Sequence, residues 1–149
     1  MVVRYFRDNH YLHKEALMKK NAVLCLTGTV AYPLLEILWR GHTHISMAAA
    51  GGVCLPVINL VCNSPKMKRR PMGVRCAAGA LSITAVEFCF GVVVNLMLRQ
   101  QVWDYSKMPL NLLGQVCLPY TVLWSFLSFP AIHLCSFLTG KCNSFSQKR

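Results

Sequence analysis

The stretch that decides the fold runs from Cys76 to Leu98 and reads CAAGALSITAVEFCFGVVVNLML. Its only charged residue is Glu87. An α-helix needs about 20 consecutive, mostly apolar residues to cross the hydrocarbon core of a bilayer. We therefore predict a transmembrane helix over residues 76–98.

Three other apolar stretches predict three more spans, over residues 22–39, 45–62 and 112–138. The whole chain is 54% hydrophobic and only 14% charged, whereas about a quarter of the residues in soluble domains are charged. We interpret the first stretch as an uncleaved span, because it lacks the small-residue cleavage site of a signal peptide. The predicted fold class is an all-α membrane protein with four transmembrane helices.

Basic residues are divided unequally between the two ends of these spans. Thirteen of the sixteen Lys and Arg residues lie before the first span, between the second and third, or after the fourth. Because Lys and Arg concentrate in cytoplasmic segments, we predict that both termini are cytoplasmic. Residues 1–21 are then a cytoplasmic segment, either an interfacial helix or a frayed polar tail, and residues 139–149 are a basic tail.

A basic cluster lies between the second and third spans and consists of Lys66, Lys68, Arg69 and Arg70. Such a cluster suits the anionic headgroups of membrane lipids, and the alternative is that it only sets the topology. Nucleic acid is not a predicted partner, because a soluble domain this small could not bury so much apolar surface. The chain has no G-x-x-x-x-G-K-[ST] sequence, which excludes a P-loop ATPase.

A short internal repeat connects the second and fourth spans. Residues 51–56 read GGVCLP and residues 114–119 read GQVCLP, and the span before each copy contains one glutamate. This pattern predicts two tandem helical hairpins related by a pseudo-twofold axis along the membrane normal. Chance similarity between apolar segments is the alternative.

Two glutamates lie inside the predicted spans, Glu36 in the first and Glu87 in the third. An ionised carboxylate that faces lipid costs roughly 2.5–3.5 kcal/mol on insertion scales. Each glutamate therefore has to face a partner helix or water, or be protonated. Arg40 follows Glu36 by four residues, a spacing at which the two side chains can pair.

The helix face that carries Glu87 is polar. Thr84, Glu87, Gly91 and Asn95 follow one another at steps of three or four residues and share one face. Because no basic residue occupies this face, the partner of Glu87 has to come from another helix. The candidates are Tyr120, Gln115 and Arg40.

The two glutamates carry most of the functional signal. The functional hypothesis is that they bind a cation, a proton or a substrate group inside the bundle. The alternative is that they form hydrogen bonds that hold the helices together. The candidate binding residues are Glu36, Glu87, Arg40, Asn95, Gln115 and Tyr120.

The loop between the third and fourth spans is too polar and aromatic to be a simple connection. We predict that Asn111 caps the fourth helix and that the loop folds over the outer mouth of the bundle, either as a gate or as a structural cap. The candidate residues in this loop are Trp103, Asp104, Tyr105, Ser106 and Asn111.

Several of these residues together resemble a known family. The resemblance rests on Glu36, Glu87, Phe88, Gly91, the string WDYS at residues 103–106, Asn111, Gly114, Tyr120 and Trp124. It is to the bacterial ABC-transporter type IV, or CmpB-like, proteins and their small four-pass animal relatives, the transmembrane protein 229-like proteins. The resemblance covers residues 30–125 and implies a compact four-helix protein of the bacterial cytoplasmic membrane. It implies no particular chemistry.

Three functions fit the sequence. The first is a transporter or permease subunit that uses Glu36 and Glu87, and the second is a non-transporting interaction or regulatory subunit. The third is an intramembrane enzyme acting on lipid through Glu36, His42, Glu87 and Asp104. A chain of 149 residues leaves little room for a complete path, so a homodimer or another membrane subunit is an expected partner. No catalytic residue, metal site or cofactor is predicted.

Overall fold

The computed structural model describes the secondary structure of residues 2–146 and the side chains of residues 14–140. In chain order the elements are α1 (Val2–Arg40), α2 (Ile45–Cys62), the 3-10 helix η1 (Met67–Arg69), α3 (Met72–Gly91), the π-helix η2 (Val92–Met97), β1 (Asn111–Leu112), β2 (Val116–Cys117) and α4 (Leu118–Ser146). The two strands pair antiparallel, with Asn111 opposite Cys117.

Four helical segments are long and apolar enough to cross a membrane. They are Lys14–Arg40, Ile45–Cys62, Met72–Met97 and Leu118–Gly140. Each lies over one of the four predicted spans. The predicted all-α fold with four spans is therefore confirmed, and the chain is an integral membrane protein.

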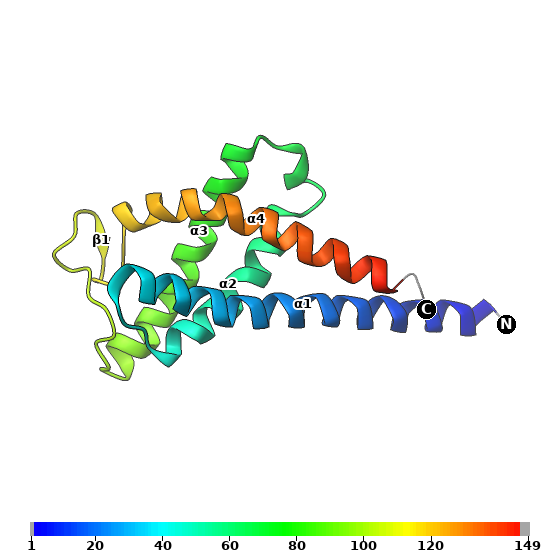
Figure 1. Ribbon diagram of the computed structural model, residues 1–149, viewed down its shortest axis with the longest axis horizontal. Helices are drawn as coiled ribbons and strands as arrows, with labels where there is room; N and C mark the ends of the chain where they lie inside the picture. Colours follow the sequence, from blue (N-terminus) through cyan, green and yellow to red (C-terminus); the bar gives the residue numbers. More distant parts are fainter. Residues whose placement is uncertain (1, 147–149) are drawn as a thin grey trace.

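The helices form two consecutive hairpins. α1 packs most extensively against α2, and α3 packs against α4. Residues 41–44 and 98–117 lie together at one end of the bundle, which we call the loop end (Figure 1). The start of α1 and the end of α4 lie far from the loop end, and the N-terminal part of α1 extends past the other helices (Figure 1).

Glycines allow α1 and α2 to approach closely. A Cβ atom placed on Gly28 would collide with the backbone carbonyl of Gly51, and a Cβ on Gly51 would collide with the carbonyl of Gly28 and with Cβ of Tyr32. Small residues at such crossings are typical of membrane helices, whose association depends on close van der Waals packing. This crossing sets the position of Tyr32 relative to the rest of the bundle.

A polar contact joins three helices at the end opposite the loop end. Arg75 Nε donates to the carbonyl of Cys62 over 3.0 Å, and Arg75 Nη2 donates to Asn63 Oδ1 over 2.7 Å. Asn63 Nδ2 in turn donates to the carbonyl of Ile132 on α4 over 3.3 Å. The bond to Cys62 satisfies a carbonyl group at the end of α2 that has no partner within the helix, and the other two bonds connect α2 to α3 and α4.

The fourth helix begins later than predicted. It starts at Leu118 and not near residue 112, and Asn111 lies in β1 and does not cap the helix. The residue after Leu118 is Pro119, which fits the first turn of a helix because the amide donor it lacks would have no partner there. Before it, Leu110, Leu113 and Gly114 have positive φ angles of 51°, 53° and 67°, so the chain turns repeatedly.

The repeated six-residue strings adopt different conformations. Residues 51–56 lie inside α2, whereas residues 114–119 form a turn, β2 and the start of α4. The two halves of the chain therefore share the pairing of consecutive helices, but the repeated string does not occupy equivalent positions in them.

The N-terminal segment is continuous with the first span. The backbone of α1 is helical from Val2 to Arg40 without a break. The side chains of residues 1–13 and 141–149 lie outside the described residues. An interfacial position for residues 1–21 and a basic tail at residues 139–149 therefore stay predictions.

Candidate functional site

A cavity of about 280 Å³ lies near the loop end and is lined by α1, α3, α4 and the loop before α4. Its charged lining residues are Glu36, Arg40 and Glu87. Its aromatic lining residues are Tyr32, Trp39, Tyr105, Tyr120 and Trp124, and its leucines are Leu35, Leu38, Leu123 and Leu127. The two glutamates of the predicted spans thus reach the same cavity from different helices.

Glu36 lies in the second-to-last turn of α1 and is compensated by its neighbours. Arg40 Nη2 forms an ion pair with Glu36 Oε1, which confirms the predicted pairing, and Thr43 Oγ1 donates to Glu36 Oε2. The glutamate is only 9% exposed. Arg40 Nε is buried and has no hydrogen-bond partner among the described residues, so Arg40 holds Glu36 through one nitrogen.

Glu87 on α3 is 6% exposed and accepts hydrogen bonds from two other helices. Tyr32 Oη on α1 donates to Glu87 Oε1, and Trp124 Nε1 on α4 donates to Glu87 Oε2 over 2.7 Å. The predicted partners of Glu87 were wrong. The crossing of α1 and α2 places Tyr32 beside Glu87, and Arg40 pairs instead with Glu36 on its own helix. Among the described residues, Glu87 forms no ion pair.

The aromatic rings of the cavity form contacts with one another. Tyr105 stacks on Tyr120 with 4.6 Å between the ring centroids, and Tyr32 lies 5.7 Å from Trp124. Trp39 Nε1 donates to Tyr120 Oη over 3.4 Å and so connects α1 to α4. Burial, and to a lesser degree the negative charge of Glu87, raises the pKa of Tyr105 well above its ordinary value, so this hydroxyl stays neutral at physiological pH.

Two predicted site residues, Asn95 and Gln115, lie in a different buried cluster. Asn95 Nδ2 donates to Gln115 Oε1 over 2.9 Å and to the carbonyl of Trp103 over 3.0 Å, while Asn95 Oδ1 accepts from the amide of Val102. Trp103 Nε1 donates to the carbonyl of Gln115 over 2.9 Å. Neither amide lines the cavity, and the cluster fixes the loop onto η2, which continues α3.

The remaining loop candidates hold the loop in shape. Asp104 Oδ1 accepts from the backbone amide of Ser106 over 2.8 Å and from its hydroxyl. Asn111 Nδ2 donates to the carbonyls of Ser106 and Met108. Of the five predicted loop residues, only Tyr105 lines the cavity. These contacts favour the structural cap over the gate.

We expect the loop to keep its shape between pH 8 and pH 5 and to change only in acid. The hydroxyl and the amide of Ser106 lower the pKa of Asp104 below its ordinary value of 3.8. A carboxylate with a lowered pKa stabilises the folded form above its unfolded pKa, and this contribution is lost as the pH falls through the folded value. Fluorescence of Trp103, measured with the other two tryptophans replaced by phenylalanine, should therefore change below pH 4. A transition near pH 6 would contradict this assignment.

Three aromatic residues of the cavity were not among the predicted site residues, namely Tyr32, Trp39 and Trp124. Helical spacing could have found all three. Tyr32 precedes Glu36 by four residues, and Trp124 follows Tyr120 by four, so each shares a helix face with a predicted site residue. Trp39 follows Glu36 by three residues, a spacing that also lies on one side of a helix, and its bond to Tyr120 depends on where α4 packs.

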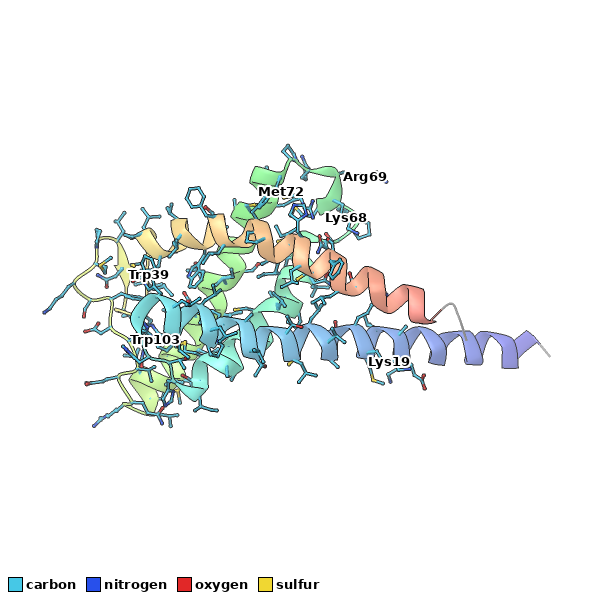
Figure 2. The ribbon with its side chains drawn as sticks, in the orientation of Figure 1. Lys19, Trp39, Lys68, Arg69, Met72 and Trp103 are labelled. Atoms are coloured by element: carbon cyan, nitrogen blue, oxygen red, sulfur yellow. The ribbon has the colours of Figure 1, made fainter. Side chains whose placement is uncertain are left out.

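The basic cluster lies away from the cavity. Lys66, Arg69 and Arg70 line an open depression of about 570 Å³ together with Pro65. Figure 2 shows Lys68 and Arg69 far from Trp39 and Trp103, which lie at the loop end. Binding of anionic headgroups at this depression stays a prediction.

These features define the chain as a four-helix membrane protein with a carboxylate-containing cavity near the loop end. A family model described as "Putative ABC-transporter type IV" matches residues 45–149, and the chain belongs to this family. The match includes Glu87, Tyr105, Tyr120 and Trp124 but not α1. No curated protein and no solved structure matches the chain. The likeness to animal relatives stays a resemblance.

Proposed function

We propose that this protein is a membrane transporter or permease subunit that binds a cation, a proton or a positively charged substrate group in the cavity at Glu36 and Glu87. The observation that carries the proposal is that carboxylates from two different helices line one cavity. Buried ionisable residues in membrane spans commonly mark ion or substrate paths. The transporter description of the family supports the same function.

Glu87 has unused capacity to bind a ligand. A carboxylate offers about four acceptor positions, and Tyr32 and Trp124 fill two of those on Glu87. Both donors are neutral, so neither cancels the charge of the carboxylate. A cation in the cavity would compensate that charge in surroundings of low dielectric constant, where the attraction is strong.

The size of the chain limits its role. Four spans leave little room for a complete path, so we propose that the protein works as a homodimer or with another membrane subunit. The sequence lacks a nucleotide-binding motif, and any ATP-driven role would need a separate ATPase chain. The distribution of basic residues supports an orientation in which the loop end faces away from the cytoplasm.

A non-transporting interaction or regulatory subunit is the second candidate. It is favoured by the bonds of Glu87, which connect α1, α3 and α4 through Tyr32 and Trp124. The geometry does not favour the third candidate, a lipid-modifying enzyme. His42 is exposed and Asp104 bonds to Ser106, and neither side chain lines the cavity.

Ion flux into liposomes tests the proposed function. Purified protein would be reconstituted with the pH dye pyranine inside, and sodium, potassium and choline would be added outside in turn. We expect at least one cation to change the internal pH, and we expect Glu87→Gln and Glu36→Gln to lower the initial rate at least tenfold.

Glu15→Gln is the matched control, because Glu15 is also on α1 but is exposed and, within residues 14–140, pairs with Lys19 at the surface. It should keep the original rate. A protein that is inert toward every cation tested, with variants that lose only thermal stability, would favour the interaction subunit instead.

A further inference from the structure

We infer that the ligand of the cavity is an amphiphilic organic cation that reaches it from the bilayer between α1 and α4. Its charged headgroup would lie beside Glu87 among the aromatic rings, and its apolar chain would lie along the leucines. The inference rests on the proposed function, for which it names the class of substrate.

The charged side chains of the cavity leave one negative charge without a partner, which a single positive group can neutralise. Glu36 is already paired with Arg40, so these two side chains cancel. Glu87 receives hydrogen bonds from Tyr32 and Trp124 and has no ion-pair partner among the described residues. When Glu87 is ionised, the lining therefore carries one net negative charge, which a monocation neutralises.

The aromatic lining selects an organic cation over a metal ion. Hard metal ions bind through six or more oxygen ligands, whereas five of the twelve lining residues are aromatic. Faces of Trp and Tyr rings attract cations, and aromatic cages of this kind recognise quaternary ammonium groups. The Tyr105 and Tyr120 pair and the Tyr32 and Trp124 pair bring rings from α1, α4 and the loop to the same cavity.

An apolar slot adjoins the cavity and has room for the first few carbons of a hydrocarbon chain. It has a volume of about 70 Å³ and shares Tyr32, Leu35, Trp124 and Leu127 with the cavity. No charged side chain lines it. Alkyl groups leave water favourably for such surroundings, so a ligand with both a cationic head and an apolar chain uses both spaces.

On α1, the lining of the cavity includes residues that are exposed on the outside of the bundle, where lipid surrounds a membrane span. Leu38 is 84% exposed and Trp39 68% exposed, although both line the cavity and lie within a span. At the loop end, Trp39 and Tyr105 both contact Tyr120, and these three side chains cover the cavity on that side. A ligand dissolved in the bilayer can therefore reach Glu87 without first passing through the loop.

Binding of dodecyltrimethylammonium to the full-length protein tests this inference. The protein would be held in dodecyl maltoside, whose uncharged headgroup does not compete, and binding would be followed by emission of the tryptophans that line the cavity. We expect dodecyltrimethylammonium to bind at least tenfold more tightly than either tetramethylammonium or dodecyl sulfate. Equal binding of dodecyl sulfate, or of tetramethylammonium, would overturn the inference.

Variants separate the roles of the head and the chain. Glu87→Gln should weaken dodecyltrimethylammonium at least tenfold, and Glu15→Gln should leave it unchanged. Ala131→Phe, which fills the apolar slot, should weaken the long-chain probe but not tetramethylammonium. If Glu87→Gln does not fold, Tyr105→Leu replaces it, because Tyr105 lines the cavity and makes no bond to Glu87. The inference is refuted if dodecyltrimethylammonium still binds as tightly to the Ala131→Phe variant and to the Glu87→Gln variant, or to Tyr105→Leu where that variant replaces Glu87→Gln.

The binding and flux experiments fail independently. Binding of the amphiphile without flux of any cation keeps the inference and rejects the transporter. Flux of a small inorganic cation without binding of the amphiphile keeps the transporter and rejects the inference.

Discussion

Replacing Arg40 with methionine is expected to lower the free energy of unfolding by about 3 kcal/mol. Removing one partner of a buried ion pair costs about 3–5 kcal/mol, because the other charge is left uncompensated. The side chain of Glu36 is 8% exposed and that of Arg40 is 22% exposed, which places this pair at the lower end of the range. Thr43 alone would remain to hold the carboxylate. Unfolding by dodecyl sulfate in mixed micelles would measure the change.

The same helix provides a matched control for this prediction. Lys19 and Glu15 have the same spacing of four residues on α1, but their side chains are 70% and 62% exposed. Exposed pairs contribute less than about 1 kcal/mol, so Lys19→Met should change little. Removing both charges with Glu36→Gln and Arg40→Met together should restore much of the lost stability. Equal effects of Arg40→Met and Lys19→Met would mean that Glu36 is not buried as described.

Gly51→Ala is expected to lower the free energy of unfolding by about 2–3 kcal/mol, in the upper part of the range for overpacked cores. The added Cβ would meet the carbonyl of Gly28 and Cβ of Tyr32, so α1 and α2 would have to separate. Because Tyr32 donates to Glu87, the separation should also weaken the bond between α1 and α3. Thermal unfolding in micelles would show the loss.

Gly140→Ala should not destabilise the protein. Gly140 lies in α4, and a Cβ there would meet nothing within 4 Å. Alanine is favoured over glycine in a helix by up to about 1 kcal/mol, so this substitution should be neutral or slightly stabilising. If both alanine variants raise the stability, the close crossing at Gly28 and Gly51 is not present in the folded protein.

The positions of the predicted site residues show how far local patterns reach. The pair of Glu36 and Arg40 was predictable because both residues belong to one helix, where a spacing of four residues nearly determines the contact. The shared face of Glu87 and Asn95 was also predictable. The partners on that face were not, because Glu87 meets α1 and α4 while Asn95 meets the loop.

The loop before α4 was the weakest part of the prediction. Leu110 and Leu113 have positive φ angles, a conformation that sequence patterns assign to glycine or asparagine and not to leucine. The hydrogen bonds of Asn111 and the pairing of β1 with β2 stabilise these turns. Apolar composition alone therefore extended the fourth span six residues too far.

By itself the sequence determined the four membrane spans, the all-α fold and the ion pair inside α1, since hydropathy and helical spacing are properties of neighbouring residues. Only the tertiary structure decided that Glu36 and Glu87 share a cavity, that Tyr32 and Trp124 hold Glu87, and that Asn95 and Gln115 lie elsewhere. The physical reason is that contacts between helices depend on where the helices cross. In this bundle the crossing of α1 and α2 depends on two glycines that have no side chains to keep the backbones apart.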